Sequence, residues 1–84
     1  MPRLTYLSQT ANSISVTYAD MPGSAQIVFV NDTSGAQTLS QSNTLSAGDG
    51  TADIAIPSLA SGKYHLSAQS NGQSIAQTVP FYLT

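Results

Sequence analysis

The residue pair in this chain with the clearest chemical potential is His65 and Ser67. The two residues are separated by one position in an alternating segment, so both point to the same face if that segment is a β-strand. A hydroxyl group beside an imidazole could belong to a nucleophilic site, but such a site also needs an orienting third group and an oxyanion hole in a concave pocket. Because the sequence indicates neither, we expect both to be solvated strand residues, and we predict a protein that is not an enzyme and has no cofactor.

The carboxylate side chains are four scattered aspartates, and the chain contains no glutamate. This composition is a poor basis for a paired-carboxylate glycosidase site. Asp49 and Asp53 could offer oxygen ligands to Ca²⁺, but their spacing lacks the regular ladder of Asp and Asn and the terminal Glu of a calcium-binding loop. We expect Asp49-Gly50 to form a turn and Asp53 to lie on the polar face of a strand, with weak Ca²⁺ binding left open.

Charge is scarce throughout the chain. Only 7% of the 84 residues are charged, against about a quarter in a typical soluble domain, and the formal net charge is −2. Two basic residues cannot neutralise the several phosphates that nucleic-acid binding requires, and they form no basic cluster for an anionic membrane. The longest apolar run, residues 27–30, is far shorter than the roughly 20 residues of a membrane-spanning helix. We therefore expect protein partners or self-assembly, with a glycan as the other option, and neither nucleic acid nor membrane insertion.

The elements that must position these residues are strands. Apolar and polar residues alternate with a period of two between turn residues, and helical periodicity is missing, which is typical of a half-buried antiparallel sheet. Ile14, Val16 and Tyr18 show the clearest alternation. The segment Met21-Pro22-Gly23-Ser24 predicts a type II turn with Gly23 at positive φ. Further strands are expected at about 24–31 and 51–57, with a weak edge strand or hairpin, anchored by Leu39 and Leu45, between them.

Asn71 and Gly72 form the strongest short hairpin signal, because both residue types tolerate the positive φ of a two-residue turn. With these two residues as the loop, the register of the C-terminal hairpin follows directly. The expected cross-strand pairs are Ala68 with Ile75, Leu66 with Gln77, Tyr64 with Val79 and His65 with Thr78. This register leaves Gln77 as the one polar side chain on the core face and turns Pro80 outward, where it indicates an edge or a bulge.

About seven strands are expected at short spacing, which favours a single two-sheet sandwich domain over residues 1–84. Part of the chain also resembles the E strand, the E–F corner and the F strand of immunoglobulin-like domains: Ile54-x-Ile56-Pro57-x-Leu59-x-x-Gly62-x-Tyr64-x-Leu66-x-Ala68. The resemblance implies an immunoglobulin-like sandwich, a structural corner at Leu59, Gly62 and Tyr64, and a hydrogen bond from Tyr64 back across the corner. Since cysteine and tryptophan are absent, the chain is more similar to the divergent modules of bacterial surface proteins and of phage capsids and tails.

Strand 24–31 is unusual because both of its faces are apolar: Ile27 and Phe29 take one face, and Val28 and Val30 take the other. Only one face of a strand is buried in a sandwich. Valine also fills half-exposed strand positions for its β-propensity alone, which is the simpler explanation. If this strand lies beside the C-terminal hairpin, one outer surface with almost no charge is formed by Val28, Val30, His65, Thr78 and Tyr82, and we treat it as the predicted partner surface.

Glycan binding usually relies on exposed aromatic side chains, most often tryptophan, and this chain has none. The alternation assigns four aromatic residues to the core: Tyr18, Phe29, Tyr64 and Phe81. Tyr6 and Tyr82 are therefore the residues left for stacking on a sugar.

No charged residue follows Lys63, so Pro80 is the only residue in the last strand expected to hinder pairing with another chain. Free edges are commonly protected by charges, and an unguarded edge is tolerated where a neighbour covers it. We therefore predict a non-enzymatic structural or interaction module, such as a phage capsid or tail accessory protein, in a virion or at the cell surface. The alternative is an extracellular glycan-binding or adhesin domain from a larger bacterial surface protein or polysaccharide-acting enzyme. Residues 1–4 pass directly into alternating residues, so no signal peptide is expected in this chain.

Overall fold

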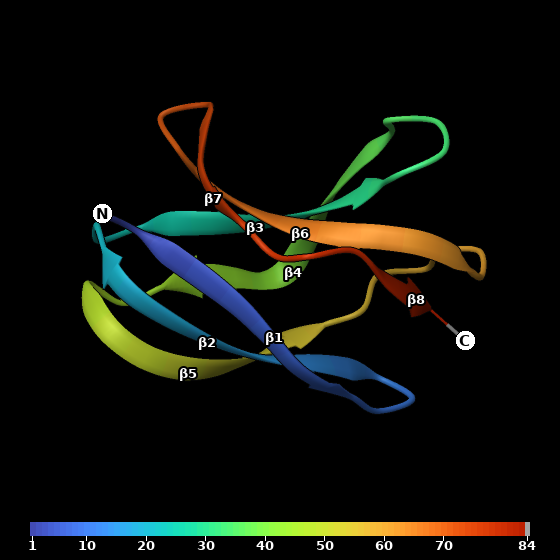
Figure 1. Cartoon of the computed structure of the whole chain (residues 1–84), viewed down its shortest axis with the longest axis horizontal. Helices are drawn as coiled ribbons and strands as arrows, with labels where there is room; N and C mark the ends of the chain where they lie inside the picture. Colours follow the sequence, from blue (N-terminus) through green and yellow to red (C-terminus); the bar gives the residue numbers. More distant parts are fainter. Residues whose placement is uncertain (84) are drawn as a thin grey trace.

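The computed structural model describes residues 1–83, with only the backbone described for 41–43. Every regular element in this part of the chain is a strand, so the predicted all-β class is confirmed (Figure 1). In chain order the strands are β1 (Arg3–Gln9), β2 (Ser13–Met21), β3 (Ala25–Asn31), β4 (Gln37–Leu45), β5 (Gly48–Ala55), β6 (Gly62–Ser70), β7 (Gln73–Gln77) and β8 (Phe81–Leu83).

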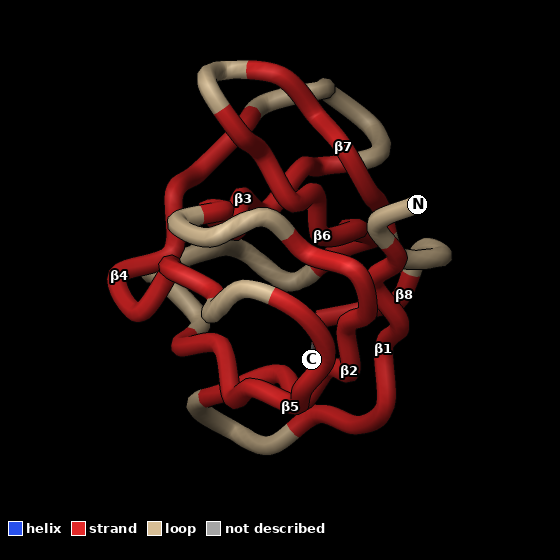
Figure 2. The backbone as a smooth tube through the Cα atoms, turned by 90° about the vertical axis from the view of Figure 1, so that its left-hand side faces the viewer, coloured by secondary structure: helices blue, strands red, loops and turns tan. Residues whose placement is uncertain are grey.

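The strands form two antiparallel sheets that pack against each other. The first sheet has the order β1-β2-β5, and the second has the order β4-β3-β6-β7, with β8 also paired to β6. Figure 2 shows that loops occupy little more than the short connections between strands. β7 and β8 are successive parts of one edge, interrupted near Pro80, which has no backbone N–H to donate. Eight strands are therefore present in the described residues, where about seven were expected.

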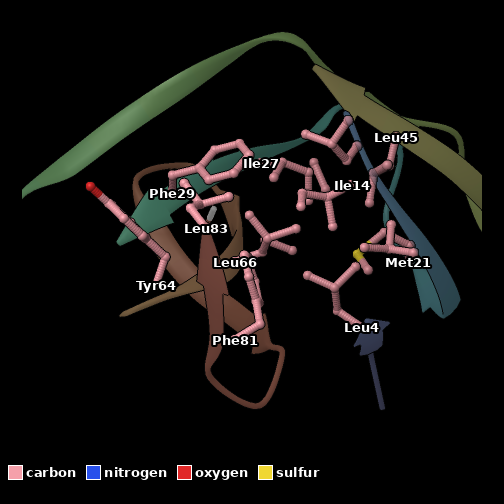
Figure 3. Packing of buried hydrophobic residues seen from close by; sticks show 14 residues of the cluster. Leu4, Ile14, Met21, Ile27, Phe29, Leu45, Tyr64, Leu66, Phe81 and Leu83 are labelled. Carbon is pink, nitrogen blue, oxygen red and sulfur yellow. The ribbon is translucent and has the colours of Figure 1, made fainter. Parts of the chain in front are cut away.

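The core lies between the two sheets and consists of the side chains that the strands direct inward (Figure 3). In β2, Ile14 and Val16 are fully buried, as their alternation with polar residues predicts. The other buried members are Leu4, Met21, Ala25, Ile27, Phe29, Leu45, Ile54, Tyr64, Leu66, Ala68, Phe81 and Leu83. Because the chain has no cysteine for a disulfide, burial of this apolar surface, at roughly 25 cal/mol per Å², is the main stabilising contribution.

Two predicted turns differ in the structure. Positive φ occurs at Ser24 (67°) and not at Gly23, so the prediction of a type II turn there is wrong. Asp49-Gly50 is not a turn but part of β5, where Gly50 pairs with Tyr18. A Cβ on Gly50 would lie 2.7 Å from the hydroxyl oxygen of Tyr18. The glycine therefore permits the close approach of an aromatic ring and is not needed to reverse the chain.

The C-terminal hairpin turns at Asn71 and Gly72, whose φ values are 53° and 79°. This is the left-handed conformation that a two-residue hairpin turn requires. Next to the turn Ser70 pairs with Gln73, which is the expected register. Beyond this point the expected register is wrong, because the ladder shifts twice along β7 and β8.

The first shift is a bulge at Ile75, which the ladder skips, so that Ala68 pairs with Ala76 and not with Ile75. A shift of one residue turns every following side chain to the other face of the sheet. Gln77 now pairs with Ser67 on the outer face. The bulge thus removes the one polar side chain that the expected register placed on the core face.

The second shift lies between β7 and β8. Thr78 donates its backbone N–H to the carbonyl of Leu66 (2.9 Å). Val79 and Pro80 then stand together opposite the single residue His65, and the ladder resumes in β8. This shift restores the original phase, so both ends of β8 are buried again. Val79, which was expected in the core, is instead 72% exposed.

Side chains connect the two sheets at both edges of the sandwich. On one edge Tyr6 of β1 stacks on Phe81 of β8, with the ring centroids 4.8 Å apart. On the other edge Ser40 of β4 is fully buried and donates a hydrogen bond to the carbonyl of Ala55 in β5 (2.8 Å). Tyr6 was expected to be free for stacking on a sugar, but its ring is used within the fold because β1 lies beside β8.

Candidate interaction surface

The five residues of the predicted partner surface differ widely in accessibility. On the outer face of the second sheet Tyr82 is 67% exposed, and Val30 and His65 are half-buried. Val28 lies on the same face but is only 5% exposed. Thr78 is 6% exposed and lies on the other face, so its predicted position was wrong. The accessible part of the predicted surface is therefore its half near Tyr82.

Two glutamine side chains cover Val28. Gln69 of β6 donates from Nε2 to Oε1 of Gln37 of β4 (3.3 Å), and these two strands flank β3. The hydrogen bond therefore passes over the outer face of β3, where Val28 lies. Val28 is shielded by amide groups of its own sheet. Sequence alternation alone could not reveal this cover, because the two glutamines are 32 residues apart.

Thr78 is buried because the bulge at Ile75 turns it inward. Its backbone N–H donates to the carbonyl of Leu66 (2.9 Å), and its Oγ1 accepts a hydrogen bond from the backbone N–H of Leu66 (3.0 Å). The threonine hydroxyl thus takes the place of the backbone carbonyl that a regular antiparallel ladder would supply. Val79, the next residue, occupies the exposed position.

His65 and Ser67 lie on the same face of β6, but they are bonded to different partners. Nδ1 of His65 lies 2.5 Å from Oδ1 of Asp32, and the two side chains are 19% and 20% exposed. Ser67 is only 2% exposed, so the expectation that it is solvated was wrong, and its hydroxyl lies 2.7 Å from the hydroxyl of Ser74 in β7. Because the Ser67 hydroxyl is bonded to β7 and not to the imidazole, the pair lacks the contact that would activate a nucleophile.

Asp49 and Asp53 accept hydrogen bonds from β2 at separate points. Asp49 accepts from the backbone N–H of Asp20 (2.8 Å), and Asp53 accepts from the hydroxyl of Ser15 (2.6 Å). Four residues along a strand span about 13 Å, too far for the two carboxylates to share a cation. Among the described residues no group of three or more His, Cys, Asp or Glu could hold a metal ion.

The Met1 ammonium donates to the Asp20 carboxylate. This hydrogen bond, and after it the Coulombic attraction of the same ammonium group, lowers the pKa of Asp20.

Charged side chains are unevenly divided between the two sheets. Those of the first sheet are Arg3, Asp20, Asp49 and Asp53. On the second sheet Lys63 begins β6 and Asp32 follows β3, and the Asp32 N–H donates to the Lys63 carbonyl (2.9 Å). The second sheet therefore carries no net charge, and its two edges, β4 and β7–β8, contain no charged residue.

Two exposed apolar side chains on the second sheet were missing from the predicted surface. Leu39 of β4 is 49% exposed and pairs with Val28, and Val79 is 72% exposed between β7 and β8. The pairing of β4 with β3 shifts between Gln26 and Val28 of β3, so Leu45 is buried whereas Leu39 faces outward. Neither exposed side chain could be found from alternation, because each depends on a shift in strand pairing.

Tyr64 closes the corner between β5 and β6. Its ring is in the core, 4% exposed, while its hydroxyl donates to the carbonyl of Ala60 four residues upstream (2.9 Å). Figure 3 shows this hydroxyl directed away from the rest of the cluster. Leu59 packs against the core from the corner, and Gly62 begins β6. The hydrogen bond is the one that the immunoglobulin resemblance implies for Tyr64.

We expect Tyr64→Phe to lower the free energy of unfolding by about 1–2 kcal/mol, because the Ala60 carbonyl loses its partner while the ring stays in place. Urea denaturation followed by circular dichroism measures this change. Tyr82→Phe is the matched control, since it removes the hydroxyl of an exposed tyrosine, and it should change the stability by less than about 0.5 kcal/mol. Equal losses in the two variants would show that the corner bond does not stabilise the fold.

No family model matches the chain, and comparisons with curated proteins and with solved structures find no match either. None of the described residues forms a helix that could cross a membrane. The structure defines an all-β protein with two antiparallel sheets packed together. Its most distinctive surface is the second sheet, which has no net charge and exposes Leu39, Val79 and Tyr82.

Proposed function

We propose that this chain is a non-enzymatic structural module that acts by burying the outer face and the β7–β8 edge of its second sheet in a larger assembly. The observation that carries the proposal is the exposure of Val79 (72%) and Tyr82 (67%) on an edge without charge. β1 covers the part of this edge where Gln9 bonds to the Tyr82 carbonyl, but the exposed part lacks the charged side chains that usually protect a strand edge. Burial against a neighbouring subunit offers the alternative protection, and it needs no chemistry.

The finer assignment of an immunoglobulin-like sandwich is part of this proposal. It is supported by the bond from Tyr64 to Ala60, by the separation of β1-β2-β5 from β4-β3-β6-β7, and by β8 pairing with β6. The assembly that best fits a low-charge module of this kind is a multi-subunit particle such as a phage capsid or tail. In such a particle a permanent neighbour covers the edge.

A photoreactive phenylalanine analogue, incorporated at Val79 in the organism that encodes the chain, tests the proposal. We expect irradiation to produce a covalent protein adduct from position 79. The control is the same analogue at Thr51, which is exposed on β5 in the first sheet and should give no comparable adduct. Equal yields at the two positions, or no adduct from either, would overturn the proposed role of this edge.

The second candidate is an extracellular glycan-binding or adhesin domain, and it is supported by the exposure of Tyr82, which pairs with Lys63 on β6. An exposed ring beside a cationic side chain is a reasonable platform for a sugar. This candidate is weaker because Tyr6, the other expected stacking residue, packs on Phe81. A glycan array that shows binding abolished by Tyr82→Ala would favour it over the structural role.

A further inference from the structure

We infer that two copies of this chain pack face to face through the outer surfaces of their second sheets, with Leu39 of one copy against Val79 of the other. This inference rests on the proposed function and names the partner. Exposed apolar side chains lie at both edges of the sheet: Leu39 (49%) on β4, and Val79 (72%) with Tyr82 (67%) on the opposite edge. A single patch would suit any apolar partner, whereas two patches on opposite edges suit a symmetric one.

A two-fold axis parallel to the strands would bring these two edges of the two copies together. Such an axis, placed between β3 and β6, reverses the strand order of the second copy and sets its β7–β8 edge over β4 of the first. This rotation does not change the position of a residue along the strand direction. Leu39 is paired across the sheet, through Val28 and Ser67, with Gln77, so it lies at the same level along the strands as Gln77. Val79 is two residues beyond Gln77, about 7 Å further along the strand. Each contact is made twice, as a two-fold interface requires.

Charge complementarity supports a second copy over other partners. The same axis places β6 of one copy over β3 of the other, so Lys63 at the start of one β6 faces Asp32 at the end of the other β3. These two residues are at the same height, since the Asp32 N–H bonds to the Lys63 carbonyl within one chain. Opposite charges thus meet twice across the axis, and no other charged side chain lies on this sheet in the described residues.

The area of the face is sufficient for a modest dimer. The Cα atoms extend over 31 Å along the longest axis and 21 Å along the shortest, which gives a sheet face of projected area on the order of 650 Å². Stable interfaces of standard size bury about 800 Å² per partner. Between its apolar edges the face carries glutamine and serine side chains, which are compatible with an interface because they bring no charge to be desolvated.

Sedimentation velocity on the full chain from 1 µM to 1 mM tests the inference, and we expect a concentration-dependent dimer. Leu39→Lys and Val79→Asp should each weaken dimerisation at least tenfold, because each introduces a charge into an apolar contact twice. The double variant should recover at least tenfold over the weaker single variant, because the introduced ammonium group faces the introduced carboxylate. Thr51→Lys, on the exposed face of β5, is the control and should change the dissociation constant less than twofold.

Single-cysteine variants provide a second measurement that does not depend on buried charge. The natural chain has no cysteine, so a bismaleimide cross-linker with a spacer of about 10 Å should join Leu39→Cys of one copy to Val79→Cys of the other in a mixture of the two variants. Each variant alone should give much less covalent dimer. Equal yields in the mixture and in the separate variants would overturn the predicted contact.

Several outcomes overturn the inference: a monomer at all concentrations, a dimer that neither single variant weakens, or a double variant with no recovery. These outcomes are distinguishable from failure of the proposed function. A chain that is monomeric at 1 mM but forms an adduct from position 79 with a different protein excludes the second copy and retains the structural role. A monomer without any adduct excludes both.

Discussion

Phe29→Ala should lower the free energy of unfolding by about 3–5 kcal/mol, which is the usual cost of removing a buried aromatic side chain. Phe29 is fully buried in β3, the strand between β4 and β6, and its ring lies among the core side chains of both sheets (Figure 3). The loss has two parts: the transfer free energy of the ring and the cavity that the rigid surroundings leave. For a domain of this size it corresponds to a fall in the melting temperature of at least roughly 12 °C.

Urea denaturation and a thermal scan measure this effect, and Gln26→Ala is the matched control on the same strand. Gln26 is exposed on the outer face of β3, so its truncation should change the stability by less than about 0.5 kcal/mol. The slope of the free energy against urea should stay constant in both variants, since the same surface is exposed on unfolding. A loss below about 1 kcal/mol for Phe29→Ala would show that the strand does not lie at the centre of the core.

Phe81→Ala should lower the free energy of unfolding by about 3 kcal/mol, and its effect should spread to β1. Phe81 is 7% exposed in the short strand β8, and its ring stacks on that of Tyr6 at 4.8 Å with an interplanar angle of 20°. Gln9, at the end of β1, also donates from Nε2 to the Tyr82 carbonyl (2.8 Å). Loss of the ring removes the stacked aromatic contact between β1 and β8.

Hydrogen exchange separates this local effect from a general loss of stability. In Phe81→Ala the amides of β1 should exchange faster than the global loss of stability alone explains, whereas those of β3 should follow global unfolding. Tyr82→Ala is the control, because its side chain is exposed and its carbonyl remains available to Gln9. A double-mutant cycle of Tyr6→Leu and Phe81→Leu should give a coupling free energy of about 0.5–1.5 kcal/mol. A coupling near zero would contradict the role of the stacked pair.

The core of the protein was largely predictable from the sequence. Ile14 and Val16 alternate with serine and threonine, and Leu66 and Ala68 alternate with histidine, serine and glutamine. All four are fully buried, because a period of two assigns one face of an uninterrupted strand to the core. The hairpin loop at Asn71-Gly72 was equally predictable, because few residue pairs tolerate two positive φ values in succession.

The predicted surface was less accurate than the predicted core. Val28 is covered by the glutamine pair, and Thr78 is turned inward by the bulge at Ile75. Val79, expected opposite Tyr64, is turned outward by the same bulge, and the ladder regains its original phase only before β8. Surface positions depend on the sum of all register shifts between them and the turn, so one unpredicted bulge was enough to reverse their faces.

The sequence by itself determined the all-β class, the inward residues of the regular strands and the scarcity of charge. Only the tertiary structure decided which apolar side chains face outward, namely Leu39, Val79 and Tyr82 on the second sheet. The physical reason is that alternation specifies a face only while the ladder is continuous. Where the ladder takes up extra residues depends on contacts between distant segments, such as Tyr6 on Phe81 and Thr78 on Leu66.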